Sequence, residues 1–139
     1  MALHPELEGK RYTCDDTKED PCPSDIKGKV YLILDGARRW IPNPATYNNL
    51  FRDWNGIEPL SQSFLREIDE GTQIADGAVL VNQTDPPAPA VYLITEAAVN
   101  TKRHIASPAT ADKFHFDLGK IVHIPKVVLD AVPTGPEIV

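Results

Sequence analysis

The segment at 39–74 reads RWIPNPATYNNLFRDWNGIEPLSQSFLREIDEGTQI, and the segment at 103–138 reads RHIASPATADKFHFDLGKIVHIPKVVLDAVPTGPEI. The two segments align without a gap at an offset of 64 residues, and both begin with arginine and end with isoleucine. A repeat of this length is one supersecondary unit, which buries its apolar face against its neighbour. The sequence therefore predicts an internally duplicated protein.

The duplication also extends toward the N-terminus. The tetrapeptide VYLI occurs at 30–33 and again at 91–94, an offset of 61, so the second repeat carries three extra residues before Arg103. An insertion of this size is tolerated at the turn of a hairpin. We therefore expect a β-hairpin in each repeat, and Asp35-Gly36 supplies the positive-φ turn of the first one.

The remainder of each repeat alternates helices with a strand. Asn43-Pro44 and Ser107-Pro108 are typical of an N-cap followed by proline at the first helical position. The predicted elements are helices at 44–51 and 108–114, strands at 57–60 and 121–124, and second helices at 62–68 and 126–132, which end before Gly71 or at Pro133 and Gly135. A further strand at 78–81 is expected to pair with 90–95, and its counterpart in the first repeat is the segment 10–14.

These elements predict an α+β protein of two tandem pseudo-two-fold repeats that share one core. Each repeat reads as β-hairpin, short helix, strand and short helix. The chain of 139 residues is expected to form a single domain, with repeat one at about 9–74 and repeat two at about 76–138. Neither repeat alone has enough large apolar residues for a core of its own, so each is expected to complete the interior of the other.

Composition and charge narrow the functional classes. The formal net charge is −6, with a pI near 5.1, which argues against a nucleic-acid partner because phosphate binding needs clustered Lys and Arg. No apolar run approaches the length of a membrane span, and the first ten residues show no signal-peptide core. The thirteen prolines favour short elements joined by fixed turns.

Cys14 and Cys22 lie in a polar stretch bounded by proline. A disulfide between them would close a short surface loop, and no second pair of Cys or His follows at metal-ligand spacing. Two free thiols are the alternative. The sequence favours the disulfide.

The pattern V-Y-L-I, a turn, R-x-I-x-x-P-x-T, D-x-x-x-I and L-x-x-x-x-x-G resembles a short repeat module of bacterial secreted and surface proteins. The resemblance covers residues 28–74 and 90–138. It implies a secreted or cell-surface setting, and a cytoplasmic one is the alternative. The module has no settled activity, so the resemblance assigns no functional residues.

Catalytic and metal-binding signatures are absent from the sequence. There is no G-x-S-x-G, no P-loop, no G-x-G-x-x-G and no H-E-x-x-H. His115, Asp117 and His123 could be imagined around a metal ion. We instead interpret Phe114-His115-Phe116 and the neighbouring His123 as partly exposed strand or loop positions. The sequence thus predicts a protein that is not an enzyme, with no metal and no cofactor.

One cluster of aromatic, amide and charged residues is a candidate binding site. Flat rings, amides, carboxylates and arginine forks are the groups that hold a sugar, which presents an apolar face and a rim of hydroxyls. The structural alternative is that Tyr47 packs the first helix and Trp40 covers a sheet face. The predicted ligand-binding residues are Arg39, Trp40, Tyr47, Asn48, Asn49, Asp53 and Trp54.

The leading functional hypothesis is a non-catalytic, lectin-like binding module that recognises a glycan through this cluster. The alternative is a structural or adhesive module of a secreted or surface protein, whose partner is another protein. A homo-oligomer is compatible with either. A concave aromatic pocket with a polar rim would favour the glycan, whereas an exposed apolar surface would favour the protein.

Overall fold

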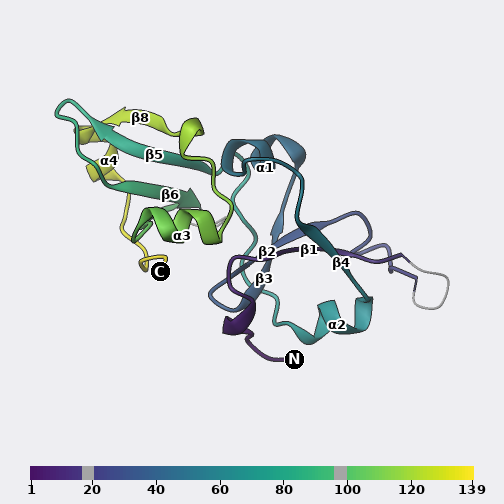
Figure 1. Cartoon of the computed structure of the whole chain (residues 1–139). Coiled ribbons are helices and arrows are strands. Elements are labelled where there is room, and N and C mark those ends of the chain that lie inside the picture. The colour runs from purple at the N-terminus through teal and green to yellow at the C-terminus, as the bar shows by residue number, and fades with distance from the viewer. Residues whose placement is uncertain (17–20, 96–99) are drawn as a thin grey trace. The chain divides into compact units, whose positions relative to one another are not determined.

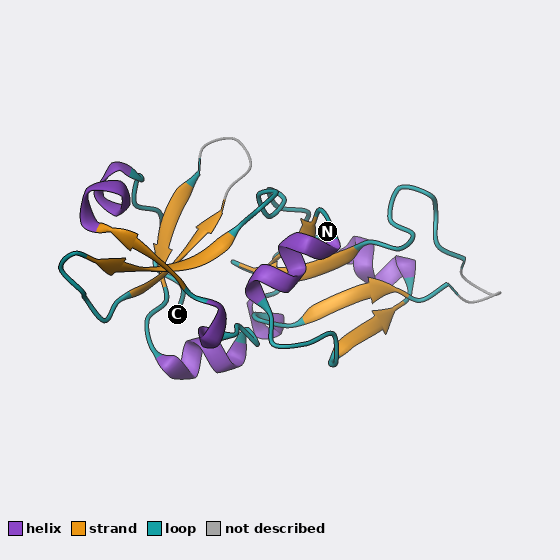
Figure 2. Ribbon diagram, turned by 90° about the horizontal axis from the view of Figure 1, so that it is seen from above, coloured by secondary structure: helices purple, strands orange, loops and turns teal. Residues whose placement is uncertain are grey.

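The computed structural model describes residues 1–16, 21–95 and 100–139. It shows the predicted α+β class, with short helices and two four-stranded sheets (Figures 1 and 2). The first sheet contains β1 (Arg11–Cys14), β2 (Val30–Leu34), β3 (Ala37–Ile41) and β4 (Ile57–Leu60); the second contains β5 (Val79–Thr84), β6 (Val91–Thr95), β7 (Thr101–His104) and β8 (Val122–Pro125). The helices are η1 (Pro5–Leu7), α1 (Pro44–Leu50), α2 (Gln62–Glu67), α3 (Pro108–Lys113), η2 (Leu118–Lys120) and α4 (Lys126–Ala131).

The two sheets have the same topology, as expected of an internal duplication. Their strand orders are β3-β2-β1-β4 and β7-β6-β5-β8, with one parallel pair at the end of each. The register is also the same, because Tyr31 lies opposite Trp40 as Tyr92 lies opposite His104. The predicted strand at 10–14, the counterpart of the strand at 78–81, is confirmed by β1.

Turn and cap residues form as the sequence predicts. Asp35 and Gly36 have φ of 58° and 75°, which closes the β2–β3 hairpin with a two-residue turn. The side chain of Asn43 accepts a hydrogen bond from the backbone of Thr46 at the start of α1, and Ser107 caps α3 in the same way. The corresponding turn of the second hairpin falls partly on 96–99, outside the described residues.

The two repeats also end alike. After α2, the N–H of Gly71 donates to the carbonyl oxygen of Arg38 at 3.0 Å, and after α4 Gly135 donates to that of Lys102 at 2.9 Å. Each returning segment thus pairs with one edge of its sheet, at β3 or β7. Covering the edge in this way satisfies backbone groups that would otherwise be open to another chain.

Most elements differ from their predicted bounds by about one residue, and the differences at β8 and β5 have a structural reason. β8 begins at Val122 rather than at Ile121, because η2 occupies the preceding turn. β5 extends to Thr84, three residues beyond the predicted strand, since it pairs with β6 on one side and β8 on the other. No helix of the described residues is long and apolar enough to cross a membrane.

The contacts divide the chain into two compact units. The first unit contains residues 1–42 and 54–73, and the second contains 43–53 and 74–139. The units therefore do not coincide with the repeats, because α1 of the first repeat belongs to the unit of the second repeat. The single-domain prediction stays a prediction.

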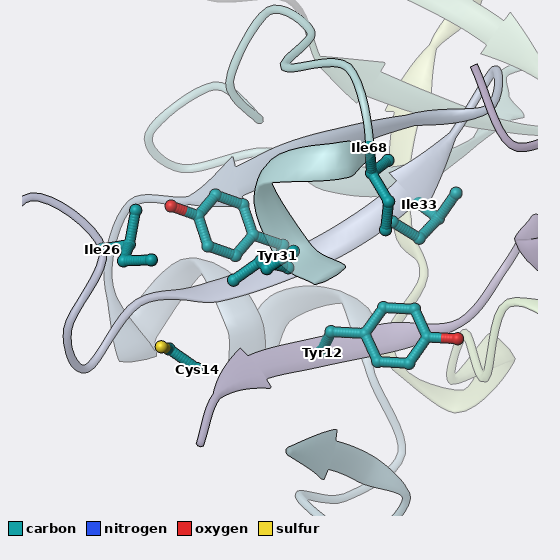
Figure 3. Packing of buried hydrophobic residues seen from close by; sticks show 7 residues of the cluster. Tyr12, Cys14, Ile26, Tyr31, Ile33 and Ile68 are labelled. Atoms are coloured by element: carbon teal, nitrogen blue, oxygen red, sulfur yellow. The ribbon is translucent and has the colours of Figure 1, made fainter. Parts of the chain in front are cut away.

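The core of the first unit lies beneath α2 (Figure 3). Tyr31, Ile33 and Tyr12 project from the sheet, Ile68 follows α2, and all four are at most 3% exposed. Cys14, at the end of β1, forms the predicted disulfide with Cys22, which ties the polar loop to this core.

The core of the second unit combines side chains from both repeats. Phe51, at the C-terminus of α1, lies with its ring centroid 5.6 Å from that of Phe116 in the second repeat. Phe114 and Phe116 are fully buried, which corrects the interpretation of Phe114-His115-Phe116 as partly exposed positions. Only His115 between them is partly exposed, at a positive φ of 60°. Within this unit, the first repeat does complete the interior of the second.

Candidate functional site

The seven residues of the predicted binding cluster are distributed over both units. Three belong to the first unit and four to the second. The first set is Arg39, Trp40 and Trp54, and the second is Tyr47, Asn48, Asn49 and Asp53.

In the first unit, two of the three side chains take part in the sheet structure. Arg39 donates to Asp35 at 2.8 Å and to the carbonyl oxygen of Leu34 at 3.2 Å. Trp40 packs against the core beneath α2, and the ammonium of Lys29 lies 4.2 Å from its ring centroid. Trp54 is 46% exposed and offers the most accessible indole of the described chain.

In the second unit, Tyr47 is buried, and its hydroxyl donates to the carbonyl oxygen of Asp53 at 2.6 Å. Asn48 and Asn49 are exposed on α1, and the amide of Asn49 donates to the carbonyl oxygen of Ala78 at 3.3 Å. The carboxylate of Asp53 lies 2.8 Å from Nε2 of His115. The ring of Tyr47 therefore packs the core, as the structural alternative has it, and the other three residues lie near the surface.

The equivalent positions of the second repeat do come together. At the offset of 64 residues, Trp40, Tyr47 and Trp54 correspond to His104, Ala111 and Leu118. These last three all line one groove of the second unit, with a volume of about 310 Å³. Each residue is smaller than its first-repeat counterpart, and the exchange of two indoles and a phenol for smaller groups leaves room for a ligand.

We call this feature the His104 groove. Its lining residues come from the start of β6, the end of β7, the N-terminal turn of α3, and η2. Ile105 and Ala111 form its buried floor, at 5% and 1% exposure, and Leu118 is 38% exposed. The complete lining is Pro89, Ala90, Val91, His104, Ile105, Ala106, Ser107, Pro108, Ala111 and Leu118. The groove is therefore largely aliphatic, and its polar side chains are those of His104 and Ser107.

The imidazole of His104 is fixed by a carboxylate. Its Nδ1 lies 2.8 Å from Oε2 of Glu137, in the segment that pairs with the edge of β7. An ionised carboxylate only accepts hydrogen bonds, so Nδ1 carries the proton and Nε2 of neutral His104 is an acceptor. The ring centroid of Tyr92 lies 5.5 Å from that of His104. The groove thus presents an oriented hydrogen-bond acceptor within a largely apolar surface.

Ser107 lines the same groove, so a serine, a histidine and a glutamate are gathered here. Acyl transfer by such a trio needs a hydrogen bond from the serine hydroxyl to the imidazole. Ser107 instead caps α3: its Oγ accepts from the backbone N–H of Thr110 at 3.2 Å and contacts the Thr110 hydroxyl at 3.2 Å. Within the described residues, no hydrogen bond joins Ser107 to His104. The arrangement is better suited to binding than to nucleophilic catalysis.

The imagined metal trio is not assembled. His115 pairs with Asp53, the carboxylate of Asp117 accepts from the N–H of Gly119 at 2.8 Å, and Nδ1 of His123 contacts the side chain of Asn82. Over the parts of the chain that the structure describes, no three His, Cys, Asp or Glu side chains are grouped as metal ligands.

The sequence prediction of a site in the first repeat stays a prediction, and three of its seven positions, Trp40, Tyr47 and Trp54, correspond to groove residues of the second repeat. It missed the aliphatic residues of the groove, such as Val91 and Ile105, because the search was for aromatic and amide groups. The signal that could have found them was the alignment itself, since three large aromatic positions are replaced by smaller residues at the same offset.

Comparisons of the chain with protein-family models, with curated proteins and with solved structures found no match.

Proposed function

We propose that the chain is a non-catalytic protein-interaction module, in which the His104 groove receives an apolar side chain of a partner protein. The observation that carries this proposal is the aliphatic lining of the groove. A sugar site uses flat rings and a polar rim, whereas Val91, Ile105 and Leu118 offer branched aliphatic surface. Protein interfaces are centred on apolar pockets that receive a single anchoring side chain.

The size of the groove supports a small occupant. Ligand pockets are usually about 300 to 1,000 Å³, and a volume of about 310 Å³ lies at the lower end of that range. The acceptor nitrogen of His104 adds a preference for a side chain that carries an N–H or O–H donor. Such a group pairs its donor with the imidazole, whereas a purely aliphatic side chain would cover the acceptor without pairing it.

The proposal includes a location outside the cell or at its surface. The Cys14–Cys22 disulfide is compatible with an extracellular location. An adhesive or structural role in a secreted or surface protein agrees with this disulfide and with the repeat resemblance.

The test is a selection from a phage-displayed library of random peptides on the immobilised full chain, with a glycan array in parallel. We expect enriched peptides that share an aromatic residue with a donor group, and that lose binding to Ala111→Phe and Leu118→Ser. Ala111→Phe fills the groove from its floor. Leu118 is 38% exposed, so Leu118→Ser tests the groove even if Ala111→Phe does not fold.

Ala109→Phe is the matched control, because Ala109 is exposed on the same helix and does not line the groove. This variant should retain peptide binding. No enriched peptide, or equal binding to Leu118→Ser and the unmodified chain, would refute the proposal. Glycan binding that is lost in Trp54→Ala or Trp40→Ala would instead establish the lectin-like function.

A further inference from the structure

The second sheet has one edge without a neighbouring strand among the described residues. The β7 edge pairs with the returning segment at Thr134, whereas β8 pairs with β5 alone. Val122 at the start of β8 is 46% exposed, and His123 after it is also exposed. An open edge presents unpaired N–H and C=O groups, which can pair with a strand of another chain. β8 is therefore the place where this sheet can be extended.

The backbone N–H and C=O of His123 point away from β5. The carbonyl oxygen of Gln83 accepts from the N–H of Ala88 within the β5–β6 hairpin, so Gln83 faces β6. Backbone groups alternate in direction along a strand, and those of the preceding residue, Asn82, therefore face β8. In a parallel pair a residue bonds to the two neighbours of the residue opposite it, and Asn82 lies opposite His123. The residues on either side of His123 thus bond to β5, and His123 itself faces the open side.

The first repeat closes the equivalent edge, at β4. At the offset of 64 residues, Pro59 corresponds to His123. The carbonyl oxygen of Leu60 accepts from a backbone N–H just after β1, so Leu60 faces β1 and Pro59 faces the open side. Proline has no N–H for a further strand, and Glu58, at the position of Val122, adds a charge. Proline and charged side chains are the usual means by which edge strands avoid pairing, and residues 122–124 of β8 contain neither.

The sequence of β8 is self-complementary about His123. When two copies of the strand lie antiparallel with His123 opposite His123, each of these residues donates its N–H to the carbonyl oxygen of the other. The N–H of Ile121 then meets the carbonyl oxygen of Pro125 of the second molecule. The missing N–H of Pro125 leaves only the carbonyl oxygen of Ile121, at the end of the contact, to water. Val122 lies opposite Ile124 of the second molecule, and such pairs of branched apolar side chains stabilise antiparallel strands.

We infer that two copies of the chain associate through their β8 strands and join their second sheets into one continuous sheet. The contact is isologous, because the same residues meet across a two-fold axis. Val127 and Val128 follow β8 directly at the start of α4 and are exposed, so they add apolar area close to the strand. The edge is short, and contacts below about 1,200 Å2 are typically weak and transient. This dimer is independent of the His104 groove, because β8 and α4 contribute no residue to the lining of that groove.

The experiment is sedimentation velocity of the full chain with its disulfide intact, at concentrations up to about 1 mM because the contact is small. We expect a monomer–dimer equilibrium. His123→Pro introduces the residue of the first repeat and should weaken dimerisation by about 10-fold or more, since both hydrogen bonds of the symmetric pair are lost. His123→Ala is the matched control, because it removes the imidazole but keeps the N–H, and it should dimerise like the unmodified chain. Val122→Glu, at an exposed position, should also weaken the dimer and decides the matter if His123→Pro does not fold.

NMR spectroscopy tests the register of the contact. In a mixture of isotope-labelled and unlabelled chain, filtered nuclear Overhauser effects should connect the methyl groups of Val122 in one molecule with those of Ile124 in the other. The amide of His123 should exchange with solvent more slowly as the protein concentration rises. A chain that stays monomeric over the whole range, or a dimer that neither His123→Pro nor Val122→Glu weakens, would overturn the inference. Equal losses in His123→Pro and His123→Ala would assign the contact to the imidazole and overturn it as well.

Discussion

A Cβ atom placed on Gly71 would lie 3.0 Å from the Cβ atom of Ala37 in β3. The same approach recurs in the second repeat, where a Cβ atom on Gly135 would lie 2.9 Å from the hydroxyl oxygen of Thr101. Each glycine also donates its N–H to the neighbouring strand, at Arg38 or Lys102. A side chain at this repeat position would meet the side chains of the edge strand, at Ala37 in the first repeat and at Thr101 in the second.

Gly71→Ala should therefore destabilise the fold by about 1 to 3 kcal/mol, the usual cost of forcing an extra methyl group into a packed site. The cost should be smaller in an Ala37→Gly background, because that variant removes the nearest carbon atom. Urea denaturation of the two single variants and the double variant gives the coupling energy. Strictly additive effects would show that the close approach is not the cause.

Most of the secondary structure could be predicted from short local sequence patterns. Asp35-Gly36, Asn43-Pro44 and Ser107-Pro108 act through backbone geometry within a few residues, so the hairpin turn and both caps form where the sequence predicts them. The repeat made it possible to predict elements with weak local patterns, because a strand that is clear in one copy implies a counterpart in the other. In this way the weak pattern at 10–14 was assigned correctly as β1.

The grouping of elements and the groove could not be predicted in the same way. The alternation of apolar residues shows that α1 buries one face, but it does not say against which sheet, and α1 is grouped with the second one. The burial of Phe114 and Phe116 follows from that choice, since Phe116 packs against Phe51 of the first repeat. A groove arises from side chains that are too small to fill a space, and periodicity carries no information about volume.

The disulfide offers a second prediction. Cys14→Ser combined with Cys22→Ser should lower the free energy of unfolding by about 2 to 3 kcal/mol, because the unfolded chain regains the freedom of the short loop. Chemical denaturation of the variant should agree with that of the unmodified chain after reduction. Equal stability of the oxidised and reduced chains would show that the loop contributes nothing to the fold.

The helix caps give a third prediction, with one cap in each repeat. Ser107→Ala should cost about 1 kcal/mol, because the N–H of Thr110 loses its acceptor. Asn43→Ala should cost more, since the Asn43 amide also donates to Asp76 at 2.7 Å. Thermal or urea denaturation measures both. In an Asp76→Ala background, Asn43→Ala and Ser107→Ala should lower the free energy of unfolding by similar amounts. A larger loss for Ser107→Ala than for Asn43→Ala in the unmodified background would contradict the stabilising role of the hydrogen bond from Asn43 to Asp76.

The fourth prediction concerns the loss of stability at high pH. Burial raises the pKa of Tyr31 above its ordinary value of 10.0, and the guanidinium of Arg38, 5.3 Å from the ring centroid, offsets this only in part. As the pH rises through 10, Tyr31 of the unfolded chain loses its proton while the folded chain retains it. The unfolded state then binds fewer protons, so the free energy of unfolding falls with rising pH. Tyr31→Phe cannot ionise and should lose less stability than the unmodified chain between pH 9 and pH 11, in urea denaturation at a series of pH values. Parallel curves for the two proteins would show that the buried hydroxyl does not govern this limit.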